Sequence, residues 1–404
     1  MWSQLPGDLV GRIADHLPTA TDLIRLRSVC SSWRSSLHLH LHLHRLRNNH
    51  RHHPTILPND GISQSSWAFS LSSRTLFLLS PSPAVDAAAT PWLVKFAHPH
   101  PSRLTLFNPF SRIPLPLPPN FPRVLDLTHI RVLELGREYV LHHVGLAGSV
   151  NPDAGSLYME KVVLLPLDAD SEFVLLTIHV SGKLAMFRTG NPRWGIIQDM
   201  PSPYDDVILY KGEFYAVDGT GRCVLVGVDM RLSLIAKSVF GGDKKYLVES
   251  LGELLLVDMY LSIDVDEDDE DGDDEEIAEL AQHFDYIVAE RTVRFRVYRL
   301  DRGSLRWVEV RDLRDRVLFL GDDCTFSASA GDLGMSTGNC IFFADNFFYP
   351  VLREDDGITK DREVGFYDMD TGSIGPLENY DGYSKLFWPP PDWITSGEFD
   401  VRNQ

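Results

Sequence analysis

The chain has 404 residues, of which 44% are hydrophobic, and a formal net charge of -19. That length suits one large or two medium domains, and no apolar run is long enough to cross a bilayer, so no membrane partner is expected. Residues 264–276 contain eleven carboxylates; removing them from the net charge leaves about -8, which does not favour nucleic-acid binding. The four cysteines form no CxxC pair, which indicates neither a disulfide scaffold nor a zinc site and favours a reducing compartment, cytoplasmic and/or nuclear.

The first forty residues are helical by pattern. Leu9, Ile13 and Leu17 recur every fourth residue, which predicts one apolar stripe of an amphipathic helix that ends before Pro18. Such a small unit cannot bury all its apolar surface by itself, so another surface must cover it. A second helical segment follows, with apolar residues at spacings of three and four: Leu23, Leu26, Val29, Cys30, Trp33 and Leu37.

The Leu5-Pro6 start, the two apolar stripes and the closing Val29-Cys30-x-x-Trp33-Arg34 resemble an F-box. This is the module by which a substrate receptor docks onto the Skp1 adaptor of a cullin-RING ubiquitin ligase. The alternative, a helical hairpin that packs on the chain's own core, has no need of that closing motif. Gly7 departs from the acidic residue often found at its position. The resemblance implies that a Skp1-like adaptor, and through it a cullin, is bound by Leu5, Pro6, Leu9, Ile13, Leu17, Leu23, Leu26, Val29, Cys30 and Trp33.

A boundary follows the predicted F-box helices, which we place at residues 1–44. Residues 45–62 are interpreted as a linker rich in His and Arg, and the prolines and the Asn-Asp-Gly turn near its end mark the start of a second domain at 63–404. Alternating histidines between His38 and His44 could hold a transition metal in an extended strand. Nothing supplies a shaped site around them, so neither a metal nor a cofactor is expected.

From residue 63 onward the pattern changes to short strands and turns. Loosely periodic hairpins without helices predict a mostly β fold, and a propeller suits so many strands better than a sandwich. At roughly 45 residues per blade, we expect about six to seven blades. Several strands close on Asp, whose carboxylate can accept backbone N–H bonds in a tight turn. The predicted strand pairs are 67–71 with 75–79, which turns at 72–74, 207–210 with 214–218, 246–250 with 254–258, and 293–300 with 305–310.

The resemblance extends into this second domain. Asn108-Pro109-Phe110, the stretch 212–218 and the stretch 388–393 are similar to segments of a large plant F-box family, whose C-terminal domain was long catalogued as a domain of unknown function. The resemblance implies a degenerate β-propeller that presents substrates. It does not indicate which residues bind the substrate.

An acidic insertion interrupts the strand pattern at about residues 262–278. Its self-repulsion predicts a disordered loop, either a solvated excursion or a lure for a basic partner. It does not fit a calcium loop, because placing Gly272 at the sixth position puts Ala278 where the bidentate Glu is required.

Catalytic motifs are absent from the sequence: there is no GxSxG elbow, P-loop or HExxH. The pairs His142-His143 and Asp205-Asp206 are interpreted as parts of surface turns. Four tryptophans could line a substrate-binding face, although packing between blades is more typical of them: Trp194, Trp307, Trp388 and Trp393.

Two classes of function follow. The favoured one is a non-catalytic substrate-recognition subunit of a Skp1–cullin–F-box (SCF) ubiquitin ligase, in which the F-box docks Skp1 and the propeller binds a protein target for ubiquitination. The alternative is a propeller with its own ligand-binding or enzymatic activity, in which the N-terminal helices are only structural. The closing Val-Cys-x-x-Trp-Arg motif favours the receptor.

Overall fold

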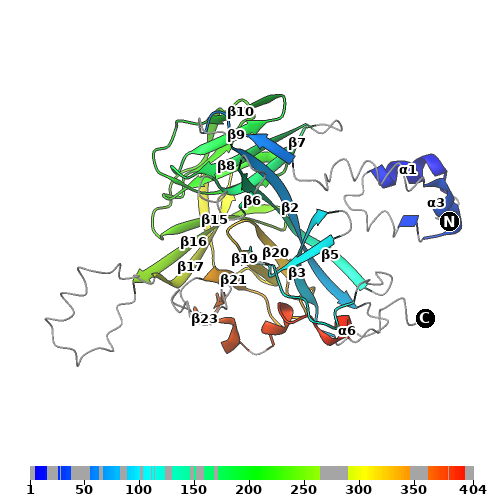
Figure 1. Ribbon diagram of the computed structural model, residues 1–404. Helices are drawn as coiled ribbons and strands as arrows, with labels where there is room; N and C mark the ends of the chain where they lie inside the picture. Colours follow the sequence, from blue (N-terminus) through cyan, green and yellow to red (C-terminus); the bar gives the residue numbers. More distant parts are fainter. Residues whose placement is uncertain are drawn as a thin grey trace.

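The computed structural model consists of a small helical part and a larger part built of strands (Figure 1). None of the described helices is long and apolar enough to span a membrane. The structure describes residues 5–15, 26–27, 29–37, 55–62, 67–81, 89–100, 103–110, 112, 114–122, 130–145, 150–151, 159–167, 172–263, 290–345, 363–380 and 382–395.

The helical part contains α1 (Gly7–Asp15) and α3 (Ser31–Ser36). The carbonyl of Pro6 accepts the first hydrogen bonds of α1, from the backbone N–H groups of Leu9 and Val10. Proline suits this position because its own N–H would lack an intrahelical partner there. At the start of α3, the Sγ of Cys30 accepts a hydrogen bond from the backbone N–H of Trp33 at 3.5 Å. In both helices the residue directly before the first turn therefore accepts hydrogen bonds from backbone N–H groups of that turn.

The strands form four sheets, one of them ten-stranded. Neighbouring strands are antiparallel except β19 and β21, which pair in parallel. The strands of the ten-stranded sheet are β1 (Thr55–Pro58), β2 (Ala68–Pro81), β3 (Trp92–His100), β4 (Arg103–Phe107), β5 (Ile130–Val144), β6 (Val150–Asn151), β7 (Met159–Pro166), β8 (Phe173–His179), β9 (Leu184–Arg188) and β10 (Asn191–Ile196). The other three sheets contain β11 (Tyr204–Tyr210), β12 (Glu213–Asp218), β13 (Cys223–Val226) and β14 (Leu232–Ala236); β15 (Lys244–Ser250), β16 (Glu253–Ile263), β17 (Glu290–Asp301) and β18 (Arg306–Val310); and β19 (Arg316–Leu320), β20 (Thr325–Ser329), β21 (Cys340–Asp345), β22 (Glu363–Asp368) and β23 (Ile374–Pro376).

Five strands, β5, β7, β11, β15 and β20, contact one another in a closed cycle and form the inner ring of a β-propeller. The ten-stranded sheet supplies two blades, because β5 and β7 share a single ladder pair, Tyr139 with Val162. Blade 1 is β2–β5 with β1 and β6 added, blade 2 is β7–β10, and blades 3 to 5 are the remaining sheets in chain order.

The mostly β fold and the propeller are confirmed, but in the described residues the blades number five rather than six to seven. Dividing the chain by an average blade length gives too many blades, because some residues of this chain belong to unusually long strands or to segments outside the blades. Strands β2 and β5 are 14 and 15 residues long. The described residues from 377 to 395 form short helices, turns and bends and add no strand to a blade. The predicted acidic insertion lies, from residue 264 onward, outside the described residues.

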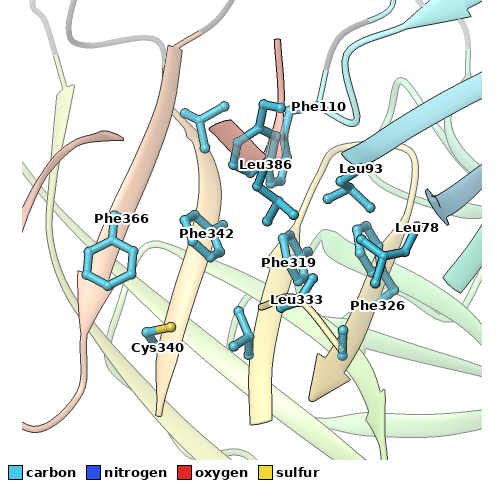
Figure 2. Close-up of a cluster of buried hydrophobic side chains, with 14 of the residues drawn as sticks. Leu78, Leu93, Phe110, Phe319, Phe326, Leu333, Cys340, Phe342, Phe366 and Leu386 are labelled. Atoms are coloured by element: carbon cyan, nitrogen blue, oxygen red, sulfur yellow. The ribbon is translucent and has the colours of Figure 1, made fainter. Parts of the chain in front are cut away.

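Each junction between neighbouring blades buries a hydrophobic cluster. Between blades 5 and 1, Leu78 and Leu93 pack toward Phe319 and Phe326, which stack with ring centroids 4.5 Å apart (Figure 2). The other four junctions are filled in the same way, which closes the ring.

The C-terminal segment covers the junction where the ring closes. It contains η3 (Leu377–Asn379), η4 (Ser384–Leu386) and α6 (Asp392–Thr395). Leu386 lies in the cluster of Figure 2. The indole N–H of Trp92, in β3, donates to the carbonyl of Phe387 at 2.6 Å, and that of Trp393 donates to the carbonyl of Thr90. The end of the chain is thus tied to the first blade.

Two local predictions were wrong. The linker predicted at 45–62 is shorter, because residues 55–58 form β1 and pair with β2. The indole N–H of Trp194 also donates to the carbonyl of Pro58 at 2.9 Å. The turn predicted at 72–74 lies inside β2, because Arg74 is buried in an ion pair with Glu138 on β5, a tertiary contact that overrides the polar local sequence.

Candidate functional site

The helical hairpin divides its apolar side chains between a buried and an exposed face. Val10 and Ala14 of α1 are buried against Trp33 and Leu37. On the neighbouring stripe of the same helix, Leu9 is 41% exposed and Ile13 is 38% exposed. Val29, which precedes α3, is 55% exposed. The hairpin therefore has a small core of its own and presents a second apolar face beside it.

Contacts of α3 with Arg27 and with Gly7 at the start of α1 fix that exposed face in place. The guanidinium of Arg27 donates to the carbonyl of Leu37, at the end of α3. A Cβ built on Gly7 would lie 3.0 Å from the Oγ of Ser36, so the absence of a side chain lets the two helices approach here. The departure from an acidic residue at this position thus has a packing reason.

The residues predicted to dock the adaptor fall into three groups. Leu17 and Leu23 lie outside the described residues. Trp33 is buried in the hairpin core, with Leu5, Leu26 and Cys30 partly buried against it. Pro6, Leu9, Ile13 and Val29 are exposed at the surface. Contact of any of these residues with Skp1 stays a prediction.

Val10 and Ala14 were missed by the sequence analysis. They are spaced by four like Leu9 and Ile13 and lie one residue further along, so the periodicity fits both stripes. The signal that distinguishes them is residue size. The small side chains of Val10 and Ala14 leave room for the large indole of Trp33, and all three are buried.

At the centre of the propeller, a buried lysine joins three blades. The Nζ of Lys161, on β7, lies 2.8 Å from a carboxylate oxygen of Asp206, on β11, and 3.4 Å from the hydroxyl of Thr325, on β20. Asp206 also accepts hydrogen bonds from the backbone N–H groups of Leu247 at 2.7 Å and Val207 at 2.8 Å. Paired charges and hydrogen bonds therefore connect the inner strands at the centre of the propeller.

A second buried network connects blades 1 and 5. Glu138 on β5 forms ion pairs at 3.1 Å with Arg74 and with Lys95. Burial raises the pKa of Glu138 against the opposing effect of the Lys95 charge. Burial would also raise the pKa of Asp323, but the hydrogen bonds from Arg112 hold that pKa below its ordinary value. Each of the two buried carboxylates thus has at least one cationic partner.

The predicted surface turns at His142-His143 and Asp205-Asp206 are wrong, because all four residues lie in inner strands. His142 shares a hydrogen bond with Ser72 at 2.9 Å, and His143 lies with its ring centroid 5.0 Å from that of Trp67. Burial raises the pKa of Asp205 to about 6, although its carboxylate accepts a hydrogen bond from the backbone of Lys245. Each of these side chains has a structural partner.

The tryptophans that could have lined a substrate face pack inside the molecule. Trp194 and Trp307 are buried at blade junctions, and each donates its indole N–H to a backbone carbonyl. Trp393 is buried beside Trp92, and Trp388 packs against the same cluster. Among the residues that the structure describes, no three His, Cys, Asp or Glu side chains gather as a metal site would require.

The helical hairpin with its open apolar face fits the F-box expected from the sequence, and the strands that follow form the expected propeller. Comparison with family models agrees: the F-box domain matches residues 2–42 and the KIB1-4 beta-propeller matches residues 68–368. The chain therefore belongs to the F-box proteins that carry a KIB1-4 β-propeller.

Two relatives from Arabidopsis thaliana are similar over nearly the whole chain. F-box protein SKIP23 is 46% identical, over 98% of this chain and 96% of its own length. F-box protein At2g17036 is 36% identical, over 100% of this chain and 96% of its own length. Neither the family models nor these relatives indicate an enzymatic family.

Proposed function

We propose that this protein is the substrate-recognition subunit of an SCF ubiquitin ligase. The observation that supports it most is the exposed apolar face of α1. Leu9 and Ile13 are large aliphatic residues left about two-fifths exposed, while the neighbouring stripe of the same helix is buried. An apolar face that the hairpin does not cover suits a partner protein, which we take to be a Skp1-like adaptor.

In this proposal the F-box recruits the cullin through Skp1, and the propeller holds a protein target. The chain itself is not catalytic. Ubiquitin transfer is accelerated because the tethered target meets the charged conjugating enzyme at high effective concentration. The pairing of the buried charges at the propeller axis favours a binding scaffold over an enzyme. We expect the protein to act in the cytoplasm or nucleus, where that ligase machinery works.

The test is adaptor binding by a variant that carries Leu9→Ala and Ile13→Ala. Full burial of a Leu or Ile side chain contributes about 1.5–3 kcal/mol, and these two are already partly buried, so we expect affinity for Skp1 to fall about tenfold to a hundredfold. The propeller should unfold at the same temperature as in the wild type. Affinity is measured by titrating purified Skp1 in a calorimeter.

Leu251→Ala is the matched control, because Leu251 is 72% exposed but lies on the propeller. It should leave adaptor affinity unchanged. Wild-type affinity in the double α1 variant would refute docking through this face.

A further inference from the structure

The loop between blades 3 and 4 displays an aromatic ring on a strained backbone. Phe240 is 71% exposed and has φ of 49°, in the left-handed region that a bulky residue rarely adopts. Its backbone N–H donates to the carbonyl of Thr220 at 3.0 Å, and so does that of Val239. The surrounding structure therefore enforces this conformation, a situation that is concentrated at functional sites.

A buried lysine holds the loop from beneath. The ammonium of Lys245, which is 0% exposed, donates to the carbonyls of Gly241 and Gly242 and lies 2.7 Å from a carboxylate oxygen of Asp258. A Cβ built on Gly242 would lie 2.0 Å from the same carboxylate, so only glycine fits there. Moving the loop would disturb a buried ion pair, and the Phe240 ring is thus presented in a preorganised position.

Two arginines lie beside the loop. A Cβ built on Gly241 would lie 2.8 Å from the hydroxyl oxygen of Tyr260, which places the loop against that ring. The guanidinium carbons of Arg294 and Arg296 lie 4.2 and 5.6 Å from the centroid of the Tyr260 ring. Both arginines are exposed, and neither forms an ion pair with a carboxylate among the described residues. We call Phe240, Tyr260, Arg294 and Arg296 the Phe240 surface.

The chemistry of the Phe240 surface defines what would bind it. Guanidinium groups recognise carboxylates through paired, charge-assisted hydrogen bonds, and an exposed aromatic ring offers an anchor for an apolar side chain. This positive spot lies on a chain with a net charge of -19, which repels long polyanions such as nucleic acids. A short acidic segment of a protein matches the local positive charge, and the net charge of the chain repels it less than a long polyanion because it carries fewer charges and lies close to the two arginines.

We propose that the Phe240 surface binds the ubiquitination target through an acidic segment that carries an apolar residue. The identity of this partner as a target rests on the receptor function proposed above. The ring inserts beside the apolar residue, while the two guanidinium groups pair with the flanking carboxylates.

The test is a fluorescence anisotropy titration of the full chain with a short labelled peptide of Asp and Glu around a single Leu. Phe240→Ala should weaken binding about tenfold, and Arg294→Glu with Arg296→Glu should weaken it by at least as much. Replacing the peptide's Leu by Ala should weaken binding to the wild type about tenfold but leave binding to the Phe240→Ala variant unchanged, since the two changes remove one contact.

The controls match the changes in exposure and charge. Leu251, 72% exposed with φ of 52°, lies at the opposite end of blade 4, and Leu251→Ala should leave the affinity within about twofold of wild type. Arg306→Glu, an exposed charge reversal on β18, should do the same. Arg294→Gln with Arg296→Gln provides a milder variant if the charge reversal lowers the unfolding temperature.

Three results would overturn the proposal. Failure of the peptide to bind the full chain is one, and equal binding to the wild type and the Phe240 surface variants is another. Binding that appears only after deletion of residues 264–276 is the third, since the chain's own acidic stretch would then be the occupant. The titration contains no adaptor, so its failure is distinguishable from a failure of Skp1 docking.

Discussion

Lys161→Ala should destabilise the propeller strongly, because it leaves a carboxylate unpaired at the axis. Asp206 is only 2% exposed, and the Lys161 ammonium 2.8 Å away is its charged partner. Breaking a buried ion pair from one side typically costs about 3–5 kcal/mol. The backbone N–H groups of Leu247 and Val207 continue to donate to Asp206, so we expect the lower end of that range, about 3 kcal/mol. That is a large fraction of the stability of an ordinary domain.

A double-mutant cycle separates the ion pair from its surroundings. Lys161→Met alone leaves the Asp206 carboxylate unpaired, and Asp206→Asn alone leaves the Lys161 charge buried, whereas the double variant removes both charges. Val207 and Leu247 donate to different oxygens of Asp206, so the single amide oxygen of Asn keeps one of the two backbone hydrogen bonds. The double variant should therefore lie within about 1–3 kcal/mol of wild type, with a coupling energy of at least about 2 kcal/mol. Urea unfolding followed by tryptophan fluorescence gives these free energies.

Arg299→Ala is the control, since its ion pair with Glu253 has side chains 43% and 52% exposed. Exposed pairs contribute about 0–1 kcal/mol, and the variant should lose no more than that. Additive single changes at Lys161 and Asp206, or a loss below about 1 kcal/mol for Lys161→Ala, would refute the role of the axial pair.

Two more predictions follow from the structure. Burial raises the pKa of Asp205 to about 6, so between about pH 4 and 6 the native state holds a proton that the unfolded chain releases, and stability falls as pH rises through that range. Asp205→Asn should flatten this dependence. It should raise the free energy of unfolding by about 1 kcal/mol at pH 8 and leave it unchanged near pH 4.5. Thermal unfolding at the two pH values measures this, and equal effects at both would contradict the prediction. A propeller that starts at residue 63 lacks β1 and the buried Leu57. In urea unfolding it should be at least about 2 kcal/mol less stable than a propeller that starts at residue 55. Equal stability of the two would support the linker predicted at 45–62.

The hairpins around glycine turns could be predicted from the sequence because their signals are local. Lys211-Gly212 and Leu251-Gly252 both adopt positive φ values, and the strands on either side pair in the register that those turns set. Asp218 likewise accepts backbone N–H bonds in the turn that ends its strand, as expected. Asp258 does not, because it lies inside β16 and pairs with Lys245, a contact that the local pattern does not reveal.

The blade count and the inward face of α1 depended on contacts between distant residues. The chain joins the long strands β2 and β5 into one ladder from Ala68 to Pro81, and no local periodicity distinguishes that from two shorter hairpins. On α1, the choice between the Leu9 and Val10 stripes is made by the shape of Trp33, some twenty residues away. The sequence was enough to place the docking face on α1. Which stripe of α1 is exposed could be known only from its packing against α3.

Charged residues were the least predictable part of this fold, because sequence patterns treat them as exposed. Lys95, Glu138, Lys161, Asp206, Lys245 and Asp258 are all buried. In a propeller without a strong repeat, apolar packing alone distinguishes poorly between possible neighbouring blades. The Lys161–Asp206 pair joins β7 to β11, so an arrangement that separates these two strands would bury both charges unpaired. By this reasoning the neutral double variant at Lys161 and Asp206 should keep most of the stability but refold more slowly and with more misassembled product, because the penalty against incorrect neighbours is gone.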